Sequence, residues 1–212
     1  MQRNAEAQII IDMKKVLFVG ILCILSVSAT FAQTRFGVTA GLNTSNITGD
    51  DVNGKYKAGF QAGLVADFGI TENFSVIPEL LFSQRGGKEN LGDGTYSMTL
   101  NYLQLPVNLA YKFHVGYGSK LFIFAGPYVG YGISASEKIT GSGASASVPL
   151  EFGSGTEQIK PLDFGVNAGI GYQYEKIFFK LQYNLGLANM SNVESASMKN
   201  TNIAVTVGYF FK

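Results

Sequence analysis

The chain has 212 residues, which is enough for a single domain, and its 16 basic and 15 acidic residues give a formal net charge of +1. Charged residues make up 15% of the chain, while aromatic residues reach 13% and glycine occurs 26 times. The charge balance gives no indication of a basic face for nucleic acid, and the charged fraction is low beside the roughly 25% of a typical soluble domain.

The N-terminal segment predicts a targeting signal. Lys14 and Lys15 precede a continuous apolar run at 16–25, and small residues then follow up to Ala32. A basic start, a short apolar core and a small-residue exit are typical of a secretory signal peptide, with cleavage here before Gln33. The alternative, a membrane anchor helix, needs about 20 apolar residues, and this run is shorter.

Three parts of the chain follow from this signal. We interpret residues 1–12 as a mis-called N-terminal extension, 13–32 as the signal peptide and 33–212 as the mature domain. The single cysteine of the chain, Cys23, lies in the predicted signal peptide. We therefore expect no disulfide and no thiol nucleophile in the mature domain. Removing three bases and two acids with the first 32 residues leaves 13 of each.

Beyond residue 32, apolar residues recur at alternate positions, which predicts strands with one apolar and one polar face. The clearest case is the segment from Leu162 to Leu187, where two such strands flank a turn at 175–176. We expect eight strands, at about 35–43, 57–69, 74–84, 99–113, 120–133, 162–174, from the 175–176 turn to Leu187, and 200–211.

The connections between these strands alternate in length. Short ones are expected at 70–73, 114–119 and 175–176, and long ones at 44–56, 85–98, 134–161 and 188–199. An even number of antiparallel strands, with short turns at one end and long loops at the other, is typical of outer-membrane proteins. The predicted fold is therefore all-β, an eight-stranded antiparallel up-and-down transmembrane β-barrel with its short turns in the periplasm.

The composition of the two faces favours lipid outside and a narrow polar lumen inside. The apolar phase is long, with aromatic residues towards the strand ends, and the polar phase is mostly glycine, asparagine and glutamine. A secreted lipocalin-like barrel would reverse the faces and hold an apolar ligand, but its soluble exterior would need many lysines and glutamates. The bacterial outer membrane is the predicted location.

Prolines at 78, 106 and 127 fall within the predicted strands. Proline cannot donate to a β-ladder, and in a closed barrel every strand has two neighbours. We therefore expect each of these prolines to lie at a β-bulge or near a rim.

Several charged and amide residues share the polar phase and should point into the lumen. Buried charges require pairing, so we expect a structural network that fills the barrel. Its predicted members are Asp67, Glu79, Lys112, Asp163, Lys180, Gln104 and Gln182. Glycines of the same phase, such as Gly165 and Gly171, would make room for the larger side chains.

The sequence offers little for catalysis or metal binding. His114 is the single histidine and falls in the predicted 114–119 turn, away from the outer rim where a lipase would need its base. Residues 50–54 (DDVNG) lack the spacing of a calcium loop. We expect no enzyme activity, no cofactor and no metal. The low-complexity stretch 141–147 predicts a flexible part of the longest loop.

Three stretches resemble the outer-membrane β-barrel family common in Bacteroidetes, described as porin-like or PorT-like. They are SVIPELLFSQ at 75–84, NYLQLPV at 101–107 and FAGPYVG at 124–130, and the likeness spans about 33–212. The chain departs from the usual C-terminal aromatic, because Lys212 follows Phe211. The resemblance implies the barrel and insertion by the barrel-insertion machinery, and it implies no defined activity.

The expected function is that of a small, monomeric outer-membrane barrel with a structural or interaction role. Its expected partners are the membrane lipid and an extracellular partner that binds the 134–161 loop. The alternative is a narrow porin-like channel for small solutes or ions.

Overall fold

A computed structural model describes residues 34–49, 52–53, 55–91, 94–141, 144–153, 159–191 and 198–211. The predicted signal peptide at 13–32 and the extension at 1–12 lie outside these ranges, as does most of the 50–54 loop. Among the described residues, no helix has the length and apolarity that crossing a membrane requires.

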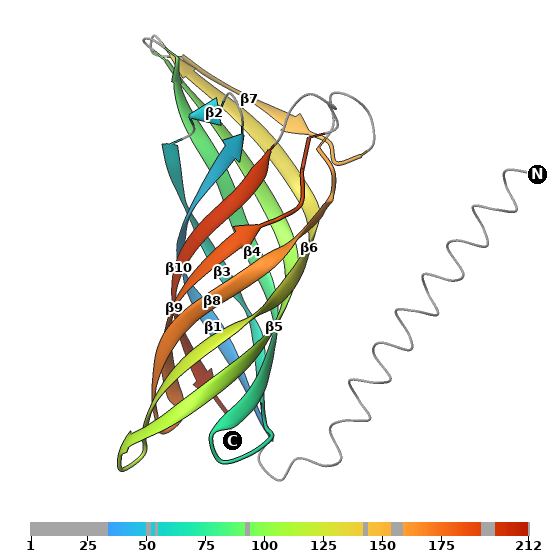
Figure 1. The fold of residues 1–212 in the computed structure, drawn as a ribbon. Coiled ribbons are helices and arrows are strands. Elements are labelled where there is room, and N and C mark those ends of the chain that lie inside the picture. The colour runs from blue at the N-terminus through green and yellow to red at the C-terminus, as the bar shows by residue number, and fades with distance from the viewer. Residues whose placement is uncertain are drawn as a thin grey trace, which may run out of the picture. The chain divides into compact units, whose positions relative to one another are not determined.

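Ten strands in the described residues form one antiparallel sheet that closes on itself (Figure 1). They are β1 (Thr34–Gly49), β2 (Val52–Asn53), β3 (Lys55–Gly69), β4 (Phe74–Leu91), β5 (Gly94–Gly116), β6 (Ser119–Gly141), β7 (Ala144–Leu150), β8 (Leu162–Tyr174), β9 (Ile177–Gly186) and β10 (Lys199–Phe210).

Eight of these strands form the ring of the barrel. Each pairs with the next in the order β1, β3, β4, β5, β6, β8, β9, β10, and β10 pairs with β1 from Gly37↔Phe210 to Thr48↔Lys199. The two other strands extend hairpins, because β2 pairs with β1 and β7 pairs with β6. The predicted eight-stranded up-and-down barrel is confirmed.

The two ends of the barrel differ in their connections. We call the end with the connections 70–73, 117–118 and 175–176 the turn end. The opposite end, where the β4–β5 and β6–β7 hairpins reach furthest, is the hairpin end (Figure 1). The predicted topology has the short turns in the periplasm, which assigns the hairpin end to the outside.

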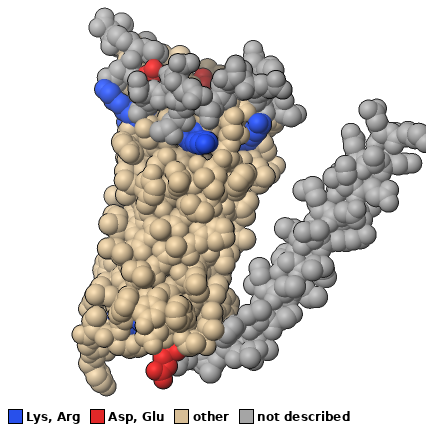
Figure 2. All heavy atoms as spheres, viewed as in Figure 1, with Lys and Arg blue, Asp and Glu red and all other residues tan. Residues whose placement is uncertain are grey.

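The apolar phase of the strands lies on the outside of the barrel. Leu64 and Ile170 are each 58% exposed, while their polar-phase neighbours are buried or partly buried. Figure 2 shows a wall that is almost free of charged side chains over its middle. This is the arrangement that lipid requires, and it is the reverse of the lipocalin-like alternative.

Aromatic side chains form a belt around the outside at the turn end. Phe74 packs edge-on against Tyr111, and Tyr111 packs against Phe113 in turn, with ring centroids 4.8 and 4.7 Å apart. Further exposed members are Phe36, Tyr172, Tyr174, Phe179, Tyr209 and Phe211. Aromatic belts of this kind mark the interface between hydrocarbon and water.

Two of the predicted long loops are largely strand. Strands β4 and β5 continue through 85–91 and 94–98, and β6 continues to Gly141 before β7 returns along it. The predicted flexible stretch is wrong for Ala144–Ser147, which pairs with β6. A hairpin in water keeps its backbone hydrogen bonds without an apolar face. The strands therefore continue at these positions, although apolar and polar residues no longer alternate there.

Of the two positions expected for the prolines, a β-bulge or a place near a rim, the β-bulge is wrong. At each proline, two residue pairs are missing from one ladder, because proline has no N–H to donate. The pairing register is the same before and after the gap, so no residue is inserted. The flanking pairs are Val65↔Glu79 and Phe68↔Val76 for Pro78, Pro78↔Val107 and Leu81↔Gln104 for Pro106, and Pro106↔Tyr128 and Leu109↔Ala125 for Pro127. The register shifts lie elsewhere, for example between Asn101 and Tyr102.

Candidate functional site in the barrel lumen

The lumen is the place where polar side chains gather away from water. All seven residues of the predicted network are buried there, from 1% exposure for Asp67 and Asp163 to 5% for Lys112. They do not form one continuous cluster. The structure separates them into layers along the barrel axis.

The layer nearest the turn end is an ion cluster around Asp67. The ammonium of Lys112 donates to both carboxylate oxygens of Asp67, at 2.7 and 2.6 Å. The guanidinium of Arg35 donates to the same carboxylate and, at 3.1 Å, to the side-chain oxygen of Gln173. Its carbon also lies 4.5 Å from the ring centre of Phe210. One carboxylate thus holds two cations where the lumen opens towards the turns.

A second ion pair, Glu79 with Lys180, lies among aromatic rings. The Lys180 ammonium donates to Glu79 Oε1 at 2.5 Å and lies 5.7 Å from the ring centres of both Phe124 and Phe178. The surrounding apolar cluster comprises Val65, Ile77, Ala110, Phe122, Phe124, Phe178 and Phe210. Because β4 and β9 are not neighbours in the ring, this ion pair crosses the lumen. Rings and ions together fill this part of the barrel.

Nearer the hairpin end, Arg85 is the centre of a third polar group. This side chain is 1% exposed, donates to Gln104 Oε1 at 2.6 Å, and forms an ion pair with Asp163 at 3.4 Å. The Tyr128 hydroxyl donates to Asp163 at 3.2 Å, and the Arg85 guanidinium carbon lies 5.3 Å from the Tyr128 ring centre. Gln104 and Asp163 therefore meet through a residue outside the predicted network.

Amide side chains occupy other inward positions, and most of their atoms lack a protein partner. The side-chain amide of Gln182 donates to the side-chain oxygen of Asn184 at 3.3 Å. Gln182 is thus bound to another amide and not to one of the ion pairs described above. Both polar side-chain atoms of several buried amides have no hydrogen-bond partner among the described residues, namely those of Asn43, Gln61, Asn167, Asn200 and Asn202. We call these five residues the amide belt. Buried polar groups of this kind are normally satisfied by water.

An apolar cluster lies at the hairpin end of the lumen. Ile47, Leu100 and Tyr102 point inward from the wall, and Ile159 and Met190 reach them from the connections after β7 and β9. The Tyr102 hydroxyl donates to the Met190 sulfur at 3.2 Å, and the backbone N–H of Lys160 donates to the Met190 carbonyl at 3.0 Å. The two connections are thereby tied across the mouth.

Inward glycines lie directly opposite inward aromatic residues. Phe122 pairs with Gly171, Phe124 with Gly169 and Tyr128 with Gly165 across β6–β8, while Phe178 pairs with Gly208 across β9–β10. A Cβ added at Gly171 would lie 2.2 Å from the Phe122 ring. Each ring therefore lies over the space that its glycine partner leaves, and this packing lets four rings share a narrow barrel.

Sequence reasoning missed Arg35, Arg85 and the inward phenylalanines. Both arginines continue the polar phase of their strands. Position 35 has the same inward phase as 37 and 39 in β1, and position 85 has the same phase as 79 and 83 in β4. Extending that phase past the predicted strand end would have found Arg85. Phe122 and Phe124 also occupy the polar phase, but their glycine partners become evident only when the β6–β8 register is known.

His114 lies in strand β5 and not in a turn. It is exposed, pairs with Lys120, and is followed by a two-residue turn at Tyr117 and Gly118, so the predicted turn 114–119 was too long. Gly118 has a φ of +71°, a conformation that favours such a tight turn. Within the described residues, no three His, Cys, Asp or Glu side chains gather in a way that could hold a metal ion.

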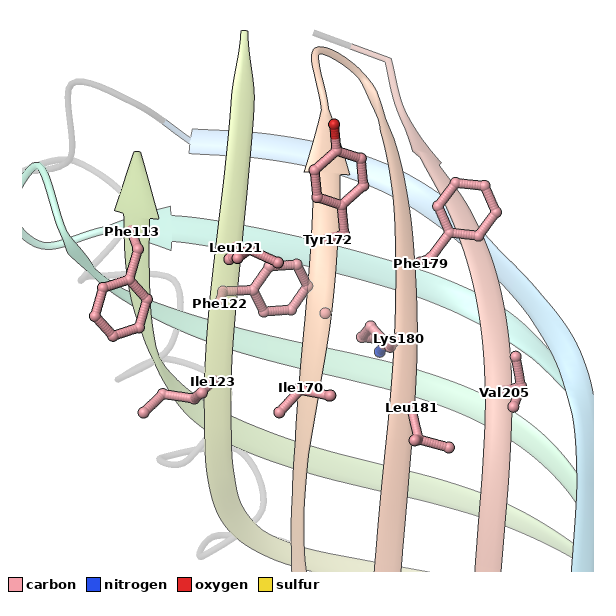
Figure 3. A pocket seen from close by; sticks show the side chains of 11 residues that line it. Phe113, Leu121, Phe122, Ile123, Ile170, Tyr172, Phe179, Lys180, Leu181 and Val205 are labelled. Carbon is pink, nitrogen blue, oxygen red and sulfur yellow. The ribbon is translucent and has the colours of Figure 1, made fainter. Parts of the chain in front are cut away.

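One hollow of the barrel lies on its outer wall. This groove has a volume of about 470 Å³. Its lining includes Phe113, Ile123, Ile170, Leu181 and Val205 (Figure 3), and also Gly171. The lining is mostly apolar and belongs to the lipid-facing surface, although Tyr172 and Lys180 are also among the lining residues. An apolar groove on this surface suits contact with lipid hydrocarbon.

A family model described as "Outer membrane protein beta-barrel domain" matches residues 31–192. Comparison with curated proteins finds no match. The match covers more than half of the chain and includes the strands from β1 to β9, which contribute most of the lumen groups described above.

Several solved outer-membrane proteins are similar to this chain. Ail of Yersinia pestis is 15% identical, with 84% of this chain and 99% of that chain covered and a TM-score of 0.41. OprG of Pseudomonas aeruginosa is 13% identical, with 85% and 97% covered and a TM-score of 0.46. Neisserial surface protein A is 11% identical, with 82% and 96% covered and a TM-score of 0.45.

Proposed function

Since the chain belongs to the outer membrane protein beta-barrel domain family and lies in the bacterial outer membrane, we propose that it serves there as a monomeric structural or interaction barrel with a closed lumen. Within that family we propose the Bacteroidetes porin-like or PorT-like type, on the three stretches that carry the resemblance. The seven lumen residues of the predicted network act as structural groups in this proposal. It includes no catalytic role.

The observation that carries the proposal is the filling of the lumen at successive levels. Near the turn end, the two ion clusters lie among four phenylalanine rings. At the hairpin end, Met190 and Ile159 cover the mouth. An eight-stranded barrel is only wide enough for its own side chains, so the paired charges leave little space for a solute.

Conductance in planar lipid bilayers tests this proposal. The purified protein should show no large, steady pore. Lys180→Ala should raise the conductance, because it removes a group that crosses the lumen and leaves the Glu79 carboxylate without its cation. Lys176→Ala is the matched control, since Lys176 is exposed in the β8–β9 turn. A large, stable conductance in the unmutated protein would contradict the closed lumen.

The amide belt favours a second candidate function, a narrow path for small ions or water. Amides without protein partners bind water, and a file of water through the barrel would permit small, intermittent openings. Replacing Asn167 and Asn202 with leucine should abolish such openings if the path passes the belt. Openings that persist unchanged would place the path elsewhere and remove this candidate.

The interaction role is proposed for the segment 134–161. The β6–β7 hairpin extends beyond the membrane wall, and residues from Ser145 to Pro149 are exposed. Co-purification from outer-membrane extracts tests it, with the full chain compared to a variant in which a short turn replaces 136–149. A partner recovered equally with both variants would exclude this segment as its binding site.

The absence of a catalytic role rests on the position of His114. A hydrolase of the Ser-His type needs its histidine at the outer, lipid-facing rim, where the substrate lies, and His114 lies at the turn end. Lipid hydrolysis by the reconstituted protein, lost in His114→Ala, would overturn this part of the proposal.

A further inference from the structure

The outer surface of the hairpin end carries a straight row of basic and hydroxyl side chains. Lys55 pairs with Lys88, Lys88 with Ser97, Ser97 with Lys138, and Lys138 with Ser147. Directly paired residues lie on the same face of a sheet, so these five side chains form one row across five strands. Neighbouring strands are about 4.8 Å apart, which sets three ammonium groups within reach of one ligand. We call these residues the basic row.

The basic row lies on the outward face. In β5 the even-numbered residues Leu100, Tyr102 and Gln104 are buried in the lumen, and the register with β4 is constant from Gln104 to Gly94. Ser97 therefore has the opposite, outward phase. Exposure agrees with this assignment, because Lys55, Lys88 and Lys138 are all exposed.

Lys57 adds a fourth cation next to the basic row. Its ammonium donates to the hydroxyl of Thr99 and, at 3.1 Å, to the carbonyl of Met98. Thr99 has the same outward phase as Ser97, two residues closer to the membrane wall. Lys57 is held at the lower edge of the row, and Thr99 adds another hydroxyl there.

Among the described residues of β3 to β7, no carboxylate has the outward phase of the basic row. Among the described residues of these strand segments, the acids are Glu89 and Glu137, which pair with Tyr96 and Met98 and so have the inward phase. None of the four lysines forms an ion pair with a described carboxylate. Like charges directly opposite each other destabilise a sheet, and Lys55 with Lys88 is such a pair. A bound anion would remove this repulsion.

The apolar wall begins directly below the basic row on the same strands. Phe60 and Phe82 pack together on β3 and β4 with ring centroids 5.6 Å apart, and Leu103 and Tyr131 continue the wall on β5 and β6. Figure 2 shows lysine and arginine gathered where the uncharged wall ends at the hairpin end. A ligand that matches both parts of this surface is an amphiphile with acyl chains below and anionic groups above.

We propose that the basic row binds the phosphate groups of a phosphorylated lipid in the outer leaflet, whose acyl chains lie against Phe60, Phe82 and Leu103. The three exposed ammonium groups supply the charge, Ser97, Thr99 and Ser147 supply hydroxyl donors, and the wall supplies the apolar contact. The site is independent of the lumen, so it stands whether or not the barrel conducts.

Binding of diphosphoryl lipid A to the folded barrel in a nonionic detergent, followed by native mass spectrometry, tests the proposal. Lys55→Gln with Lys88→Gln should weaken binding by about 25-fold, because each lysine near an anionic membrane surface is worth about fivefold in affinity. Lys120→Gln with Lys176→Gln makes the same charge change at the turn end and should leave binding unaltered. Lys55→Arg with Lys88→Arg should retain it.

Two further comparisons separate a lipid site from other anion sites. Dephosphorylated lipid A should bind the unmutated protein no more tightly than it binds the Lys55→Gln and Lys88→Gln variant. Inorganic phosphate at an equimolar concentration should not displace lipid A, because it lacks the apolar contact. Equal binding of both lipid A forms, displacement by free phosphate, or equal losses in the two double variants would each overturn the proposal. Circular dichroism checks that every variant is folded.

Discussion

The ion clusters and the amide belt are both buried in the same lumen, yet they are satisfied in different ways. Every charged side chain at Asp67, Lys112, Glu79 and Lys180 has an oppositely charged partner within 2.7 Å. The amides of the belt have no hydrogen-bond partner among the described residues. A buried ion without a partner is far more costly than a buried amide, which a water molecule can satisfy. In this lumen, charged side chains are therefore paired with each other, and neutral amides occupy the other inward polar positions.

Lys180→Ala should have the largest effect on stability, because it breaks the cross-lumen pair from one side. An uncompensated buried charge typically costs about 3–5 kcal/mol, and the Glu79 carboxylate would be left among phenylalanine rings. Urea unfolding of the protein in lipid vesicles, followed by circular dichroism, measures this loss. The result would show how strongly the layer of charges depends on pairing.

The double variant Glu79→Met with Lys180→Met is the control for that experiment. Removing both charges should recover most of the lost free energy of unfolding, since well-packed apolar residues often replace a buried ion pair without loss. A double variant as unstable as Lys180→Ala would mean that the packing volume of the two side chains, and not their charge, is what this layer requires.

Leu181→Arg and Gln182→Arg compare the two faces of one strand. Leu181 is 46% exposed to lipid and Gln182 is 4% exposed in the lumen. An arginine at mid-bilayer on the lipid face should cost about 2–4 kcal/mol, whereas the lumen offers carboxylates that can pair with it. Unfolding in vesicles should therefore rank Leu181→Arg as the more damaging change. Equal losses would contradict the assignment of the faces.

Much of this architecture could be predicted from the sequence, because a period of two is a local property. Alternation among the neighbouring residues is enough to predict that Leu181 points outward and Gln182 inward. The same local pattern predicts that Asp67 and Lys112 point inward. The extent of the hairpins could not be predicted in this way. Beyond the membrane, the ladder of β5 continues through Thr95 and Ser97, where neither face needs to be apolar.

The partners within the lumen were beyond sequence reasoning for a different reason. Glu79 meets Lys180 across 101 positions of the chain, and this contact depends on the stagger of the closed barrel, which no local pattern encodes. Arg85 was assigned to a loop, so Asp163 was left without its cation in the predicted network. Register and closure, more than residue type, decide which inward groups touch.

Gly208→Ala should have an intermediate effect. A Cβ at this position would lie 2.0 Å from the Phe178 ring, which must then move into the ion layer. Overpacking of this kind costs about 1–3 kcal/mol, and Phe178→Leu in the same chain should return part of it. Gly116→Ala is the matched control, because its Cβ would meet only Ser119, at 3.9 Å. Equal unfolding midpoints for both glycine variants would contradict the paired packing of ring and glycine.

Asn167→Ala should have the smallest effect, and it completes the comparison of ions with amides. Both polar atoms of the Asn167 side chain have no hydrogen-bond partner among the described residues, so its removal breaks no hydrogen bond that they make. Water can enter the space that the amide leaves, and the free energy of unfolding should change by no more than about 1 kcal/mol in the vesicle assay. Asn202→Ala should behave alike, because both polar atoms of that side chain also have no hydrogen-bond partner among the described residues. A loss near that of Lys180→Ala would mean that the amides form a fixed network with ordered water, as specific as the ion pairs. The contrast between the two parts of the lumen would then disappear.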